Sequence, residues 1–159
     1  MKKFENILNK LEEYMAGLLV LLMTVLIFIQ VFFRYILNSP LSWSEELARL
    51  CLVWLGFMGS VIALRKGEHI YIGNITKKLS LHKKLIYEIF SYVIIGIILI
   101  FLLIFGLDLV KEQYISTTPA LEIYYAWFTI PVPLSACLML IHICFSIYER
   151  IIQISKRGE

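Results

Sequence analysis

Ionisable side chains that could do chemistry in apolar surroundings gather in one short stretch of this chain. Arg34 ends a long apolar run, and Glu45, Glu46 and Arg49 follow it closely, beside Trp43. Glu45 and Arg49 are four positions apart, so on a helix they share a face and can pair. A charge at mid-membrane depth costs about 2.5–3.5 kcal/mol and usually marks function. We expect Arg34 to join these residues in an ion-pair network, which either caps a helix or docks another protein.

Other chemistry is poorly supported by the sequence. His142 is the one histidine inside an apolar run, whereas a haem held by two histidines needs a second one on a facing helix. The three cysteines also fall within apolar runs and form no disulfide framework. Because no carboxylate lies near the middle of an apolar run, a self-contained proton-coupled pump is not expected. We therefore predict no catalytic residue, no cofactor and no metal site.

Long apolar runs decide the fold class. Hydrophobic residues make up 60% of the 159 residues, and the mean hydropathy is +0.80. A spanning helix needs about 20 mostly apolar residues to cross a hydrocarbon core about 30 Å thick. The sequence predicts an all-α integral membrane protein with a single membrane domain over residues 1–159. We place its four transmembrane helices at about 15–37, 43–64, 86–110 and 124–148.

Charge placement predicts the orientation of the chain. Twelve of the 15 Lys and Arg residues lie before the first span, between the second and third, or after the fourth. Because basic residues stay on the cytoplasmic side, we expect both termini in the cytoplasm. Residues 1–14 have helical apolar spacing with charges between, which predicts a short amphipathic helix on the cytoplasmic surface. Membrane lipid, rather than nucleic acid, explains the basic loop.

The second predicted span carries small residues on its surface. Small residues spaced by four let another helix approach closely in a membrane. The partner helix can belong to this chain or to a second protein. The expected helix-packing residues are Gly56, Gly59, Ser60 and Ala63.

Local signals predict where two of the helices begin or bend. Ser42 and Glu45 have the spacing of a capping box, so the second span should start near Trp43. Pro131 lies inside the fourth span and removes a helix hydrogen bond. We expect a bend at Pro131.

The stretch from Phe33 to Ile70 reads FRYILNSPLSWSEELARLCLVWLGFMGSVIALRKGEHI. It resembles the small membrane subunit, the Q component, of tripartite ATP-independent periplasmic (TRAP) transporters. The family pattern is F-R-Y, N-x-P-L-S-W-x-E-E-L-A-R, V-W-x-x-F-x-G and A-x-R-x-G-x-H-I. The likeness continues more weakly at Pro119-Ala120-Leu121. Glu122 stands where the family usually has a small residue.

The resemblance implies a non-catalytic permease subunit in the bacterial inner membrane. Its expected partners are a large membrane subunit (M), which carries the substrate and sodium sites, and a periplasmic substrate-binding protein that captures an organic acid. The small subunit would scaffold the large one and help dock the binding protein. Sialic acid and dicarboxylates are both open as substrates. The alternative is an autonomous small four-helix exporter of cationic compounds, although such chains bear a mid-membrane Glu that the first span lacks.

Overall fold

The computed structural model describes residues 2–66 and 81–155, and long helices dominate it. The elements are α1 (Lys2–Tyr35), α2 (Ser42–Arg65), α4 (Leu81–Gln113), the short α5 (Ala126–Thr129) and α6 (Pro131–Ser155). Four helical stretches are long and apolar enough to cross a membrane, with α5 and α6 forming one of them. The prediction of an all-α membrane protein with four transmembrane helices is therefore confirmed.

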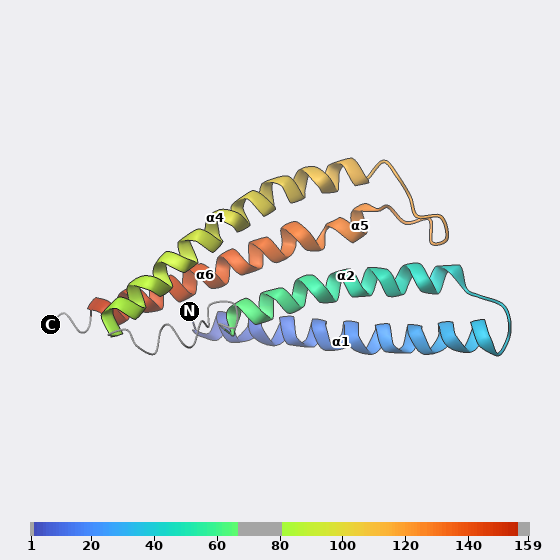
Figure 1. Cartoon of the computed structure of the whole chain (residues 1–159), viewed down its shortest axis with the longest axis horizontal. Helices are drawn as coiled ribbons and strands as arrows, with labels where there is room; N and C mark the ends of the chain where they lie inside the picture. The colour runs from blue at the N-terminus through green and yellow to red at the C-terminus, as the bar shows by residue number, and fades with distance from the viewer. Residues whose placement is uncertain (1, 67–80, 156–159) are drawn as a thin grey trace.

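The long helices lie side by side in the order α1, α2, α6, α4 (Figure 1). Helices α1 and α2 form a first hairpin, and α4 to α6 form a second; α2 packs against α6 and joins the two. The start of α1 and the end of α6 lie at one end of the molecule, called here the terminal end. The turn at 36–41 and the loop at 114–125 lie at the opposite loop end.

Helix α1 is continuous from Lys2 to Tyr35 and differs from the sequence-based expectation. The amphipathic segment predicted at 1–14 is, over its described residues, the first part of α1 rather than a separate surface helix. No Gly or Pro interrupts the segment before Gly17, so nothing in the backbone stops the helix. The first membrane-spanning helix consequently carries Glu12 and Glu13 within its length.

The turn between α1 and α2 also differs from the prediction. Helix α2 starts at Ser42, and Leu41 before it makes no capping hydrogen bond with its side chain. The predicted capping box is therefore not formed; instead, the Ser44 hydroxyl donates to the Leu41 carbonyl oxygen at 2.7 Å. Asn38 closes the turn with a φ of 47°. Asparagine is among the few residues that tolerate this left-handed backbone.

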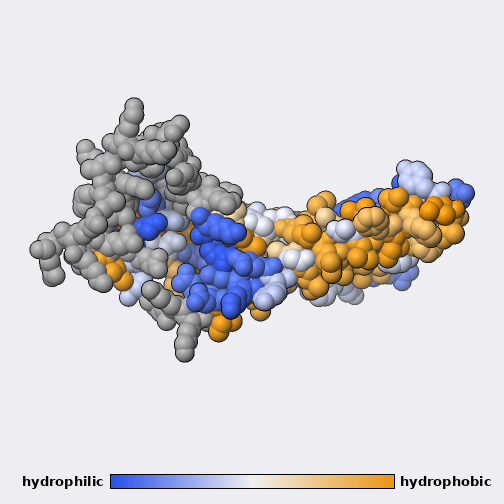
Figure 2. Space-filling model, turned by 90° about the horizontal axis from the view of Figure 1, so that it is seen from below, coloured by the Kyte–Doolittle hydropathy of each residue, from blue (hydrophilic) through white to orange (hydrophobic). Residues whose placement is uncertain are grey.

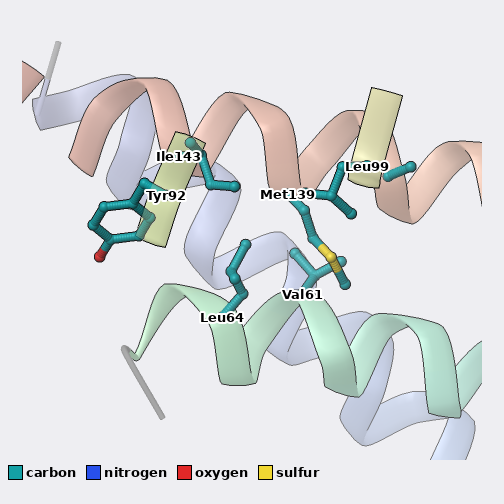
Figure 3. Close-up of a cluster of buried hydrophobic side chains, with 7 residues drawn as sticks. Val61, Leu64, Tyr92, Leu99, Met139 and Ile143 are labelled. Atoms are coloured by element: carbon teal, nitrogen blue, oxygen red, sulfur yellow. The ribbon is translucent and has the colours of Figure 1, made fainter. Parts of the chain in front are cut away.

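Helix α6 supplies the middle of the hydrophobic core (Figure 3). It lies between α2 and α4, so side chains from all three helices meet around it. The buried cluster comprises Val61, Leu64, Tyr92, Leu99, Ala136, Met139 and Ile143. Burial of this cluster fixes α6 between α2 and α4.

The fourth span is interrupted where Pro131 was expected to bend it. Helix α5 ends at Thr129, and α6 begins at Pro131 after the single residue Ile130. The Ile130 amide donates to the Ala126 carbonyl oxygen at 2.9 Å, so helical hydrogen bonding reaches the residue before Pro131. Proline lacks an amide hydrogen, which explains why the regular hydrogen bonding lapses at this point.

Large apolar side chains cover most of the outer surface. Figure 2 shows hydrophobic residues over the part of the molecule toward the loop end, with hydrophilic residues gathered nearer the terminal end. On α1, Leu21 and Phe28 are 65% and 73% exposed, and Phe105 on α4 is 66% exposed. Lipid or another membrane protein must cover these side chains.

Gly106 lets α4 approach the start of α6 closely. A Cβ atom at Gly106 would lie 3.1 Å from Val132 Cγ1, 3.2 Å from Pro133 Cδ and 3.3 Å from the Pro133 backbone nitrogen. The proline ring and backbone cannot yield as a flexible side chain can. We predict that Gly106→Ala lowers the free energy of unfolding by about 1–3 kcal/mol, as overpacking does.

The matched control is Gly96→Ala on the same helix, because a Cβ there meets nothing within 4 Å. This control should be neutral or stabilising by up to about 1 kcal/mol, the helix-propensity gain of alanine over glycine. The measurement is the thermal unfolding midpoint of each purified variant in detergent. Equal midpoints for the two variants would refute a close α4–α6 contact at Gly106.

Candidate functional site

The Glu46 carboxylate ties the two hairpins together at the loop end. Glu46 lies in the first turns of α2, and its side chain turns toward the 114–125 loop of the second hairpin. Its Oε1 accepts the Ala120 amide at 3.0 Å, and its Oε2 accepts the Leu121 amide at 2.8 Å. Hydrogen bonds to a carboxylate are roughly twice as strong as neutral ones. A single side chain thus fixes the position of the loop relative to α2.

The 114–125 loop is also ordered by its own backbone. The Thr118 amide donates to the Ile123 carbonyl oxygen at 2.8 Å, and the Tyr125 amide donates to that of Ser116 at 3.0 Å. Glu122 adopts a left-handed backbone with a φ of 54°. This conformation costs a non-glycine residue about 1–2 kcal/mol, so the surrounding contacts must hold it in place.

The other residues of the predicted charge cluster do not form one network. Arg49 and Glu45 make the expected pair at 3.3 Å, but both side chains are more than half exposed. Such a surface pair stabilises a helix by at most about 0.5 kcal/mol. Trp43 is 41% exposed on the same helix. Within the described part of the chain Arg34 makes no ion pair, because Glu45 pairs with Arg49 and Glu46 binds the loop.

A second polar contact between the hairpins lies deeper along α2. The indole nitrogen of Trp54 donates to the Trp127 carbonyl oxygen at 3.0 Å. Trp127 belongs to α5, just before the interruption at Ile130. The contact therefore fixes α5 against α2 near the place where the backbone of the fourth span is irregular.

Two of the small residues of α2, Gly56 and Gly59, have open space beside them. A Cβ added at Gly56 or Gly59 would meet nothing within 4 Å. The Ser60 hydroxyl donates to the Gly56 carbonyl oxygen at 2.9 Å and so is satisfied within α2, while Ala63 is half-buried. Hence these glycines do not serve helix packing inside the described chain, and their surface is available to another molecule.

A buried polar cluster at the terminal end was missed by the sequence reasoning. Glu12 on α1 is 1% exposed, and its Oε1 lies 2.8 Å from His142 Nε2 on α6. Arg65 at the end of α2 has its Nε 3.9 Å from Glu12 Oε2 and donates from Nη2 to Glu13 Oε1 at 2.6 Å. The cluster joins three helices, just as Glu46 joins α2 to the loop at the opposite end.

The sequence contained signals for this cluster, but their meaning depended on packing. His142 stood out as the one histidine within an apolar run, yet no partner could be assigned. The apolar spacing of residues 1–14 predicts a surface helix, and Glu12 would then lie in solvent. A further pair of the same kind joins Arg150 Nε on α6 to Glu88 Oε2 on α4 at 2.7 Å. Intramembrane polar residues usually pair with one another, so each should have been matched to a partner at similar depth.

The polar contacts of this chain are suited to holding its helices and its 114–125 loop in fixed positions. Within residues 2–66 and 81–155, no group of three or more His, Cys, Asp or Glu side chains could hold a metal ion. The contacts of Glu46 with the loop, of Glu12 with His142 and of Arg150 with Glu88 each join different elements of the chain. Together they hold the two hairpins in place at both ends of the molecule.

We predict that Glu46→Ala loosens the loop without unfolding the helices. The Ala120 and Leu121 amides lose their acceptor, so their hydrogen exchange should accelerate by about tenfold or more. Glu45→Ala is the matched control, because Glu45 is the adjacent carboxylate and pairs only with exposed Arg49. Hydrogen exchange by mass spectrometry over residues 114–125 measures both variants. Equal exchange in the two would mean that Glu46 does not hold the loop.

We predict strong energetic coupling between Glu12 and His142. A double-mutant cycle with Glu12→Ala and His142→Ala, unfolded in mixed micelles, should give a coupling energy of about 1–3 kcal/mol, because both partners are buried. The control cycle uses Asp108 and Lys111, an exposed pair at 2.9 Å, whose coupling should stay below about 0.5 kcal/mol. Comparable coupling in the two cycles would contradict a buried interhelical contact.

Comparison of the sequence with known proteins identifies a matching family and several relatives. Residues 23–153 match the family described as tripartite ATP-independent periplasmic transporters, DctQ component. The sialic acid TRAP transporter permease protein SiaT of Haemophilus influenzae is 29% identical over 84% of this chain and 22% of its own length. A putative TRAP transporter small permease protein of the same species is 26% identical over 92% of this chain and 89% of its own length.

A further relative is matched over a shorter stretch. The sialic acid TRAP transporter small permease protein SiaQ of Vibrio cholerae is 33% identical over 50% of this chain and 46% of its own length. The chain thus spans only about a fifth of the SiaT permease and less than half of SiaQ in these matches.

Proposed function

Since the chain belongs to the DctQ-component family of tripartite ATP-independent periplasmic transporters, we propose that it is the small, non-catalytic permease subunit of a sodium-coupled importer. The proposed role is to hold a larger membrane subunit in place while that subunit moves substrate. The observation that carries the proposal is the pair of hydrogen bonds that the Ala120 and Leu121 amides donate to Glu46. These bonds fix the two hairpins to each other at the loop end. A fixed array of helices suits a scaffold better than a moving carrier.

The small residues of α2 are the proposed contact for the large subunit. The surface around Gly56 and Gly59 is open in this chain, and helices in membranes associate through such surfaces. Ser60 and Ala63 continue it along α2. In the SiaT relative the region similar to this chain occupies 22% of a much longer permease. This small share of a longer permease supports the proposal that a small subunit like this chain works together with a larger membrane subunit.

The loop end is the proposed docking side for a periplasmic substrate-binding protein. The distribution of Lys and Arg predicts that both termini are cytoplasmic, which would place the loop end on the periplasmic side of the inner membrane. Arg34, Trp43, Glu45 and Arg49 have exposed side chains there, and Glu46 orders the neighbouring loop. These residues form the proposed docking and anchoring cluster.

An organic acid is the proposed substrate class. Two relatives are named for sialic acid, which favours sialic acid or a similar carboxylate over other solutes. The residues of this chain do not select among such acids, because selection belongs to the proposed binding protein and large subunit.

We predict that Glu45→Lys combined with Glu46→Lys abolishes substrate uptake by the reconstituted three-part system. The exposed pair with Arg49 is reversed, and the loop amides face a cation in place of their acceptor. Uptake of labelled substrate into proteoliposomes, driven by a sodium gradient, is the measurement. Uptake at the wild-type rate would show that both the docking and the anchoring roles are wrong.

The control for this test separates assembly from docking. Gly56→Leu combined with Gly59→Leu should reduce co-purification with a tagged large subunit, because the bulky side chains block close helix approach. The Glu45/Glu46 variant should still co-purify. Transport by this chain alone would instead support the exporter alternative.

A further inference from the structure

The start of the 114–125 loop, directly after α4, presents an apolar side chain to the outside. Ile115 is 89% exposed, the most of any described large hydrophobic residue. Tyr114 and Tyr124 are 51% and 48% exposed, and their ring centroids lie 5.7 Å apart. The two tyrosine rings contact each other, and the exposed Ile115 follows Tyr114 directly in the sequence. Exposed aromatic side chains beside an apolar one are typical of a binding hot spot.

Exposed acidic residues precede and follow Ile115 in the sequence, one at the end of α4 and one in the loop. Glu112 and Glu122 are both exposed, and neither makes an ion pair with any residue that the structure describes. The nearby cation Lys111 is already engaged, since its Nζ lies 2.9 Å from Asp108 Oδ1. Among the charged residues described here, Lys111 therefore does not neutralise Glu112 or Glu122.

The 114–125 loop is held in place although most of its side chains are exposed. Glu46 fixes the loop from α2, and the loop amides bind within the loop. Glu122 is kept in a left-handed backbone conformation that an isolated chain would avoid. Backbone strain of this kind is often retained at ligand clamps, and a rigid surface loses less entropy on binding.

We propose that Tyr114, Ile115, Glu122 and Tyr124 form the contact surface for a soluble protein whose apolar pocket is bordered by Lys or Arg. Anionic lipid headgroups would be repelled by Glu112 and Glu122, which disfavours a role as a membrane anchor. Resting on the function proposed above, the inference identifies that soluble partner as the periplasmic binding protein. It adds the 114–125 loop to the docking residues proposed at the start of α2.

The test uses the intact complex of this chain with the large subunit in nanodiscs, titrated with the substrate-loaded binding protein. Ile115→Ser should raise the Kd about tenfold, because an apolar side chain buried in the interface is lost. Glu122→Gln should raise the Kd about threefold at low salt and weaken its dependence on ionic strength.

Two controls match these variants. Ile7→Ser changes an isoleucine that is 66% exposed at the terminal end of the molecule. Glu5→Gln removes an acid from the first turn of α1, at the terminal end of the molecule. Both controls should leave the Kd within about twofold of wild type, since neither residue belongs to the proposed surface.

The outcomes separate this inference from the proposed function. If the two membrane subunits do not co-purify, or the wild-type complex does not bind the binding protein, the proposed function is wrong. If the wild-type complex binds and both loop variants bind equally well, only the contact surface is wrong. If the loop variants no longer co-purify with the large subunit, the inference is also wrong. The loop would then contact the large subunit and not the binding protein.

Discussion

A carboxylate that accepts backbone amides from a distant segment is the interaction on which the loop end depends. Glu46 makes two such hydrogen bonds, to Ala120 and Leu121, and so converts two helical hairpins into one body. A buried amide left without an acceptor costs about 1–3 kcal/mol, and these two hydrogen bonds are partly buried. The Glu46 carboxylate therefore does more than pair with a charge. It holds the loop of the second hairpin, and so it decides which side chains of that loop face outward.

The same physical device recurs at the terminal end with a different set of groups. Glu12 lies between His142 and Arg65, so α1, α2 and α6 are tied together by buried polar contacts. Between the two ends, apolar packing around α6 supplies the contact area, as Met139 and its neighbours show in Figure 3. Polar contacts at both ends and apolar packing between them give a side-by-side array whose outer faces remain free for lipid and partners.

Some features of the site were visible in the sequence, and others were not. The spacing of Glu45 and Arg49 identified their pair, because helical periodicity alone brings such residues together. The partner of Glu46 lies 74 and 75 positions away, and the partner of Glu12 lies 130 positions away. No local pattern encodes such distances. Gly106 was overlooked for the same reason, since its meaning comes from Pro133 on the neighbouring helix.

The sequence by itself determined the four apolar helices and the membrane setting, because hydropathy and helix length are local properties that the bilayer enforces. It also determined the family: the ordered motif residues lie between Phe33 and Ile70, and the family match covers residues 23–153. Only the tertiary structure decided the order of the helices, the continuity of α1 and the partners of the buried charges. Those features depend on which surfaces meet, and apolar helices of similar composition leave many pairings equally favourable until their few polar side chains select one.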